Sequence, residues 1–198
     1  MKTLLVVIGV LLLSAALFFL VGMISPGQES VSEIRVNAPL EHSWTIYHDE
    51  ELMSEWMPSV KKIDLVSGQK NTEGAEYIVT MEDQNGEDTE MRELLTKFDA
   101  PDSYSIDYSN DMLTGSMEVD FEDLGDMITV IKTTNKYKGK TTLWRSIFHF
   151  FNWKIDEETA KQGEALKLLI EETYISKQGT TPILVPQQVE TIDTSSLH

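Results

Sequence analysis

The N-terminus carries the feature that most limits how this chain can fold, an uncharged run over residues 3–24. At about 1.5 Å per residue, the run would form a helix of about 33 Å, long enough to cross the hydrocarbon core of a bilayer. Only Gly9, Ser14 and Gly22 interrupt its large apolar side chains. This length and uniformity predict an uncleaved, single-pass membrane anchor over residues 1–25.

Other interpretations of this run fit less well. A secretory signal peptide has a shorter apolar stretch that ends at a small-residue cleavage site, whereas here apolar residues continue after Ser14–Ala16. The chain contains no cysteine, which excludes a lipidated cysteine. A buried core helix would carry a polar face, and this run has none.

The charges that flank the run predict its sidedness. Lys2 and the amino terminus precede it, whereas Glu29 and Glu33 follow it before the first cation, Arg35. The positive-inside tendency then places the N-terminus in the cytoplasm and the bulk of the chain on the extracytoplasmic side of the membrane. The lack of cysteine fits either compartment.

The rest of the chain is acidic and large enough for one domain. About 150 residues remain once the anchor and a C-terminal tail are set aside, which allows a substantial core. Of the 16 basic residues only Lys2 precedes the run, so 15 basic residues stand against 33 acidic ones, a net charge of −18. Nucleic acid and anionic headgroups should repel such a domain. We therefore expect no nucleic-acid partner and a membrane attachment through residues 3–24.

Strand and turn signals predict the order of elements after the anchor. A short linker over residues 26–29 leads into a domain over residues 30–176. Residues 30–38 have the partial alternation of a strand, and Pro39 then opens a helical stretch that Pro58 ends. Further strands are expected at residues 61–68, 75–82, 89–98, 103–109, 115–123 and 127–138.

Alternating side chains in these segments indicate an antiparallel sheet with one face toward a core and one toward water. Asn85–Gly86, between two of the segments, is a strong hairpin signal. The inward set in two neighbouring segments is Tyr104, Ile106, Tyr108, Met117, Val119 and Phe121.

The C-terminal part predicts a helix followed by a tail. From Asp156 to Ser176 an apolar stripe repeats at helical spacing between glutamates and lysines. The stripe consists of Leu166, Leu169, Ile170 and Thr173. Residues 177–198 contain prolines and polar residues without periodicity, so we expect a loose tail there.

Several short motifs follow one another early in the domain: V-x-A-P, then E-x-x-W, then W-x-P-x-V-x-x-I. Their residues are Val36, Ala38, Pro39, Glu41, Trp44, Trp56, Pro58, Val60 and Ile63, and further along the chain Thr129 and Tyr137. In this order and spacing they resemble the START-like superfamily, in its polyketide cyclase/dehydrase and lipid-transport branch, the SRPBCC group. The resemblance spans residues 30–176 and contains no catalytic signature.

The resemblance implies an α+β helix-grip fold, in which a curved antiparallel sheet wraps around the long C-terminal helix and encloses an apolar cavity. The inward strand faces and the apolar stripe of the helix also need each other as burial partners. Cavities of this kind suit lipids, quinones, sterols and polycyclic compounds. The expected cavity walls are Trp56, Tyr104, Tyr108, Met117, Val119, Phe121, Phe148, Leu166 and Ile170, each of which also fits plain core packing.

No catalytic residue is predicted. His42 and His48 are six positions apart and do not form an i, i+4 metal pair. A G-x-S-x-G motif and a glycine-rich phosphate loop are both missing, and we expect neither a metal nor a cofactor. A cyclase would need a buried polar group in the cavity, and the candidates are Tyr77, Tyr104, Tyr108, Arg92 and His149.

Residues 142–155, TLWRSIFHFFNWKI, are rich in aromatic side chains at helical spacing. The apolar set is Trp144, Ile147, Phe148, Phe151 and Ile155, with Arg145, His149 and Asn152 opposite. We expect an N-terminal extension of the last helix that packs on the sheet. The alternatives are a lid over the cavity and an aromatic surface that dips into the bilayer.

Three functions are compatible with these features. The leading hypothesis is a membrane-anchored protein that binds an apolar small molecule or lipid, for example a quinone or polycyclic compound, without catalysis. The first alternative is a cyclase or dehydratase acting on polycyclic or aromatic substrates in the same cavity. The second is a cavity-free scaffold that binds another envelope protein. The sequence leaves the oligomeric state open.

Overall fold

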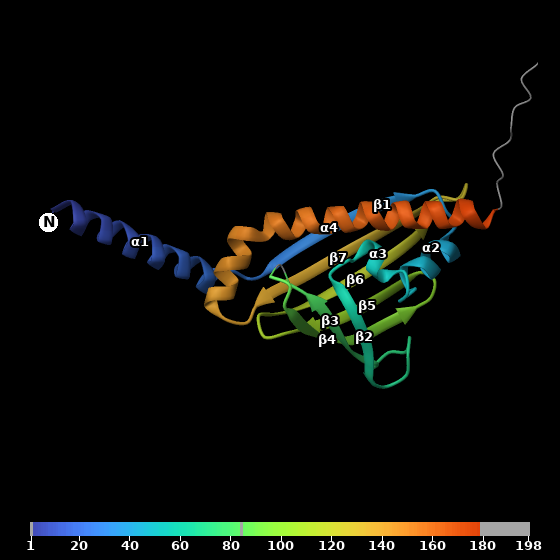
Figure 1. Cartoon of the computed structure of the whole chain (residues 1–198), viewed down its shortest axis with the longest axis horizontal. Helices are drawn as coiled ribbons and strands as arrows, with labels where there is room; N and C mark the ends of the chain where they lie inside the picture. Colours follow the sequence, from blue (N-terminus) through green and yellow to red (C-terminus); the bar gives the residue numbers. More distant parts are fainter. Residues whose placement is uncertain (1, 84, 179–198) are drawn as a thin grey trace, which may run out of the picture.

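The fold was analysed in a computed structural model that describes residues 2–83 and 85–178. Figure 1 shows the elements in order along the chain. The helices are α1 (Lys2–Ile24), α2 (Leu40–Tyr47), α3 (Met53–Trp56) and α4 (Thr142–Lys177). The strands are β1 (Gln28–Val36), β2 (Val60–Ser67), β3 (Glu76–Glu82), β4 (Asp88–Asp99), β5 (Ser103–Ser109), β6 (Leu113–Asp123) and β7 (Thr129–Gly139).

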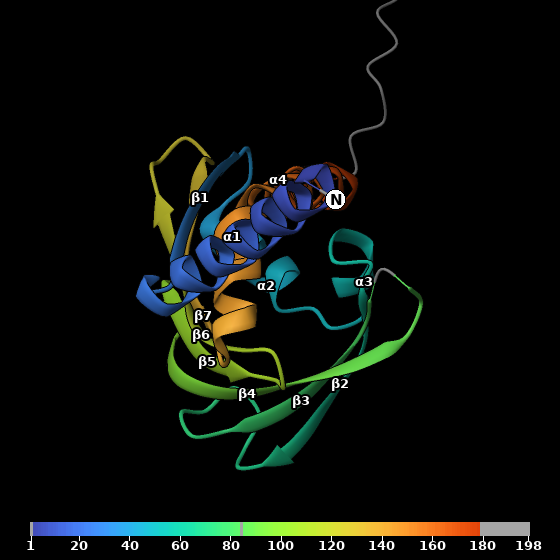
Figure 2. The same cartoon turned by 90° about the vertical axis from the view of Figure 1, so that its left-hand side faces the viewer.

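The strands form one seven-stranded sheet in the order β1-β7-β6-β5-β4-β3-β2. Every neighbouring pair is antiparallel. Figure 2 shows the sheet curving beneath α4, with α2 and α3 beside the helix on the same concave side. The expected α+β helix-grip fold is confirmed.

α4 is longer than the predicted final helix, because it begins at Thr142 and also includes the aromatic segment. Thr141 caps its start, with the side-chain oxygen accepting a hydrogen bond from the backbone N–H of Trp144. Phe148 packs edge-on against Tyr137 of β7, with the ring centroids 5.7 Å apart, as expected of an extension that rests on the sheet. α4 ends at Lys177, and residues 179–198 of the predicted tail lie outside the described residues.

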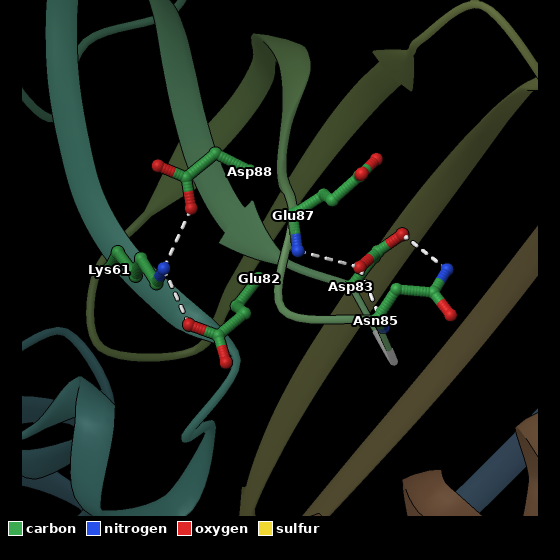
Figure 3. Close-up of polar contacts among 6 residues, drawn as sticks. All are labelled: Lys61, Glu82, Asp83, Asn85, Glu87 and Asp88. Carbon is green, nitrogen blue, oxygen red and sulfur yellow. Dashed lines mark hydrogen bonds and ion pairs between the residues drawn. The ribbon is translucent and has the colours of Figure 1, made fainter.

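The predicted hairpin lies between β3 and β4, and Figure 3 shows its polar contacts. The Asp83 carboxylate accepts hydrogen bonds from the backbone N–H groups of Asn85 and Glu87, at 2.8 and 2.9 Å. Gly86 adopts a φ of 81°, a conformation that glycine reaches without steric cost. The Lys61 ammonium of the edge strand β2 lies 2.5 Å from Glu82 and 2.7 Å from Asp88, which links three strands.

The core lies between the concave face of the sheet and the second half of α4. Ile131, Ile170, Val36 and Val119 are its largest apolar side chains that are almost completely buried. Polar contacts fix α4 to its neighbours: the Glu171 carboxylate accepts hydrogen bonds from the backbone and side-chain N–H groups of Asn37, at 2.8 and 2.7 Å. These contacts join α4 to the residue that follows β1.

α1 stands outside this core. It is long and apolar enough to cross a membrane, and its apolar side chains are exposed along most of its length. β1 begins at Gln28, so only Ser25–Gly27 separate α1 from the sheet. The chain therefore has a helix of membrane-spanning length directly before its sheet.

Candidate ligand-binding cavity

A cavity of about 470 Å³ lies between the concave face of the sheet, α3 and the middle of α4. The alternation of the strands builds its walls, because every second side chain points inward. β3 and β4 contribute Tyr77, Val79, Met81, Met91, Glu93 and Leu95, and α4 contributes Ile155, Thr159, Gln162, Gly163 and Leu166.

The structure places five of the nine expected cavity residues along the cavity wall. They are Trp56, Tyr104, Tyr108, Met117 and Leu166. Three others, Val119, Phe121 and Ile170, are 0%, 5% and 0% exposed and belong to the packed core between sheet and helices. Phe148 packs on Tyr137 near the start of α4, away from the cavity lining. That these residues contact a ligand stays a prediction.

Glu93 is the one carboxylate that β4 directs into the cavity. Its cross-strand neighbours are Tyr77 on β3 and Tyr108 on β5, which also line the cavity. Within the described part of the chain, no hydrogen bond or ion pair reaches its half-buried carboxyl group. Desolvation raises the pKa of Glu93 to about 7, so the carboxyl group can hold or release a proton near neutral pH.

Tyr47, Tyr104 and Tyr108 line the same cavity as Glu93. The Tyr47 and Tyr104 hydroxyls lie 2.8 Å apart and share one hydrogen bond. Tyr108 donates a hydrogen bond to the Asn135 side-chain oxygen. Burial raises the pKa of Tyr47 and of Tyr108 to about 12, and that of Tyr104 well above its usual value, so these phenols stay neutral. The cavity thus combines apolar walls with neutral hydroxyl groups and the carboxyl groups of Glu93 and Glu50, of which Glu50 pairs with Lys70 at 2.8 Å.

A cluster of aromatic rings closes the cavity near α2 and α3. His48 lies 5.0 Å from the Tyr104 ring and 4.1 Å from the Trp44 ring, measured between ring centroids. Its Nδ1 lies 3.0 Å from the Trp44 carbonyl oxygen, which assigns the proton to Nδ1. Burial lowers the pKa of His48, so the ring is neutral at pH 7. The His48 ring therefore adds no charge to this end of the cavity, where the lining residue Glu50 pairs with Lys70.

Of the polar candidates that a cyclase would need, the structure brings three tyrosines together and separates the other two residues. Tyr77, Tyr104 and Tyr108 line the cavity. Arg92 instead faces outward and pairs with Glu76 at 3.3 Å. His149 lies on an exposed part of α4, with Nδ1 3.5 Å from the Gln28 side chain.

Sequence reasoning missed Glu93 because acidic residues are so frequent in this chain. A usable signal was present, since strict alternation from Met91 to Leu95 puts Glu93 on the inward face of its strand. Among the residues that the structure describes, no group of three or more histidine and acidic side chains could hold a metal ion.

A family model described as polyketide cyclase / dehydrase and lipid transport matches residues 28–165. The chain belongs to this family. The match begins at the first residue of β1 and includes every strand of the polyketide cyclase / dehydrase and lipid transport domain, together with most of α4. It leaves α1 outside, so the apolar helix is an addition to the family's domain. A search of curated proteins found no match.

Solved structures share the fold of this polyketide cyclase / dehydrase and lipid transport domain at low sequence identity. A conserved protein from Geobacillus kaustophilus has a TM-score of 0.61 at 10% identity, over 74% of this chain and 97% of that one. A START superfamily protein from Mycobacterium smegmatis has a TM-score of 0.57 at 13% identity, over 76% and 99%. The di-domain ARO/CYC StfQ of the steffimycin biosynthetic pathway has 0.58 at 11% identity, over 73% and 51%.

Proposed function

We propose that this chain is a membrane-anchored protein that binds an apolar small molecule carrying one polar group. The cavity carries this proposal. Its volume of about 470 Å³ is typical of small-molecule sites, which measure about 300–1,000 Å³. Most of its lining is apolar, and Glu93 with the neighbouring tyrosine hydroxyls offers hydrogen bonds to a hydroxyl, carbonyl or amine on the ligand.

The position of α1 supports a lipid-type ligand. A span over residues 3–24 followed by a connection of only Ser25–Gly27 would hold the cavity within a few residues of the bilayer. Apolar molecules such as quinones or lipids concentrate there, because transfer of apolar surface out of water is favourable. The anchor would thus keep the cavity close to a reservoir of its ligands.

We propose catalysis as the second candidate function, and Glu93 is the observation that favours it. A carboxyl group with a pKa of about 7 inside an apolar cavity suits general acid–base chemistry, which works best when the pKa is near the operating pH. Such a group would serve a cyclase or dehydratase acting on polycyclic or aromatic substrates. Glu93→Gln should then abolish turnover while the ligand still binds.

Native mass spectrometry of the full chain, extracted from membranes in mild detergent, tests the binding proposal. We expect an apolar molecule to co-purify with the protein. Met117→Trp replaces a flexible side chain on the cavity wall with a larger indole ring that fills part of the cavity. This change should reduce the bound fraction about tenfold or more, equivalent to about 1.4 kcal/mol of binding free energy.

Leu94→Trp is the matched control for this experiment, because Leu94 is 37% exposed, next to Glu93 on the outer face of β4. It should leave the bound fraction unchanged. A purified chain that carries no apolar molecule, or equal binding by both variants, would contradict the proposal.

We also propose that the domain lies on the extracytoplasmic side, on the strength of Lys2 before the span and Glu29 and Glu33 after it. Because the chain lacks cysteine, a single Leu65→Cys change on exposed β2 gives a clean reporter. In intact cells whose outermost envelope layer has been made permeable, a maleimide that cannot cross the membrane spanned by α1 should label this cysteine. Labelling only after lysis would reverse the assignment.

A further inference from the structure

α1 packs directly against the first turns of α4. The Ser146 hydroxyl lies 2.7 Å from the Phe18 carbonyl oxygen, to which it donates a hydrogen bond. A Cβ on Gly22 would lie 2.2 Å from the Ser146 Oγ and 2.2 Å from the Thr142 carbonyl oxygen, so only glycine allows this close approach. The Phe18 and Phe150 rings stack, with their centroids 5.6 Å apart. Figure 1 shows α4 starting beside the C-terminal end of α1.

These contacts fix how deep the start of α4 lies if α1 spans a bilayer. Phe18 precedes the last residue of α1, Ile24, by six positions, or about 9 Å along the helix axis. The 23 residues of α1 extend about 34 Å, only slightly more than the hydrocarbon core of about 30 Å. A ring stacked on Phe18 therefore lies below the level at which α1 leaves the hydrocarbon.

The first turns of α4 have an apolar face that suits this depth. Leu143, Phe150, Phe151 and Trp153 are 45–54% exposed. On the opposite side, Arg145 donates a hydrogen bond to the Gly139 carbonyl oxygen at 3.0 Å. The cation thus turns toward the sheet, while the large apolar side chains turn away from the domain.

The charge distribution also changes along β7 and the first turns of α4. Residues 127–155 contain no acidic residue, although the whole chain has a net charge of −17. The cations in this stretch are Lys132, Lys136, Lys138, Lys140, Arg145 and Lys154. Lys136 and Lys138 lie beside Pro26 and Gly27, where α1 joins the sheet.

Few acidic groups lie next to Lys136 and Lys140, although the β3–β4 hairpin, further across the same end of the sheet, carries Glu82, Asp83, Glu87 and Asp88. Glu29 lies opposite Lys136 in the β1–β7 pairing, and Asp111 lies in the turn whose Met112 carbonyl accepts from the Lys140 backbone N–H. The next acid along α4 is Asp156, directly after Trp153, Lys154 and Ile155. Tryptophan next to lysine is typical of the boundary between lipid and water.

From the stacking, the exposed apolar face and the local excess of cations, we propose that residues 143–153 of α4 form a second membrane contact. This face would enter the leaflet from which α1 emerges, and Lys136, Lys138 and Lys140 would lie at the level of anionic headgroups. The proposal rests on the proposed anchoring by α1. It adds that the bilayer holds the cavity domain in one fixed orientation.

Single-cysteine variants of the full chain test this proposal. Each carries a nitrobenzoxadiazole dye, in vesicles of phosphatidylcholine and phosphatidylglycerol with or without nitroxide-labelled lipid. Phe151→Cys reports on the proposed contact. Leu168→Cys, 56% exposed further along the same helix, is the matched control. Leu12→Cys reports on the span itself.

We expect blue-shifted emission and nitroxide quenching for dyes at positions 12 and 151, and neither effect at position 168. Quenching at 12 with a water-like signal at 151 would overturn the second contact and leave the anchor intact. Water-like signals at all three positions would overturn the anchoring, and the second contact with it. Far-UV circular dichroism of each variant shows that the labelled protein is folded.

Discussion

Replacement of Ile170 by alanine is expected to lower the free energy of unfolding by about 2–5 kcal/mol. The Ile170 side chain is 0% exposed on the face of α4 that meets the sheet, in the same cluster as Val36, Val119 and Ile131. Alanine would leave a void there, because close-packed neighbours relax only partly into the space. Urea unfolding of the full chain in detergent, followed by tryptophan fluorescence, measures the loss.

Leu168→Ala provides the matched control for this substitution. Leu168 lies two positions earlier on α4 and is 56% exposed, so its truncation should change stability by about 0.5 kcal/mol or less. Leucine and alanine both favour helices, so the comparison isolates burial. Equal losses for the two variants would contradict the burial of Ile170 between helix and sheet.

Glu93→Gln is expected to stabilise the protein at alkaline pH and to have little effect at acid pH. Desolvation raises the pKa of Glu93 from 4.5 to about 7, so the folded state binds a proton more tightly than the unfolded state does. Below pH 4.5 both states are protonated and Glu93 carries no penalty. Between pH 4.5 and about 7 the unfolded state loses this proton while the folded state keeps it, so stability falls across that range and then levels off.

At about 1.4 kcal/mol per pKa unit, the full effect approaches 3 kcal/mol at pH 8, where Glu93→Gln should unfold at a higher urea concentration than the wild type. Urea titrations at roughly pH 4, 6 and 8, a range that includes the pKa values of Glu93 in the unfolded and folded states, measure this difference. Glu90→Gln, on the exposed face of the same strand, is the control and should follow the wild-type curve. Parallel curves for the wild type and Glu93→Gln would contradict a desolvated carboxyl group in the cavity.

The strands of the sheet and the final helix that covers it could be predicted from the sequence, because alternation, helical spacing and turn chemistry are local patterns. Met117 and Tyr108, for example, alternate with polar neighbours whatever lies above the sheet. Alternation cannot separate a cavity wall from a packed core, since both require apolar side chains on the inward face. Both Tyr104 and Val119, its direct neighbour on β6, belong to the core cluster, but only Tyr104 also lines the cavity. Their different surroundings depend on the curvature of the sheet, which involves every strand.

The contact between α1 and α4 could not be predicted from local patterns. Gly22 and Ser146 look unremarkable in the sequence, and their close approach depends on where β1 and β7 place the two helices. The helical spacing in residues 142–155 was visible, but it could not show that the structure divides the aromatic set, with Phe148 on the sheet and Phe151 47% exposed. Arg145 turns toward Gly139 together with Phe148, because the sheet lies on that side.

One edge of the sheet has a consequence for the proposed attachment to a membrane. β2 forms that edge, and its pairing with β3 is irregular at Val60–Lys62 and again at Leu65–Ser67. Lys61 and Lys62 lie within the strand, both engaged with carboxylates. Irregular, charged edges resist pairing with another strand. Neighbouring copies crowded on one membrane would therefore find no regular edge on β2 along which to join their sheets and aggregate.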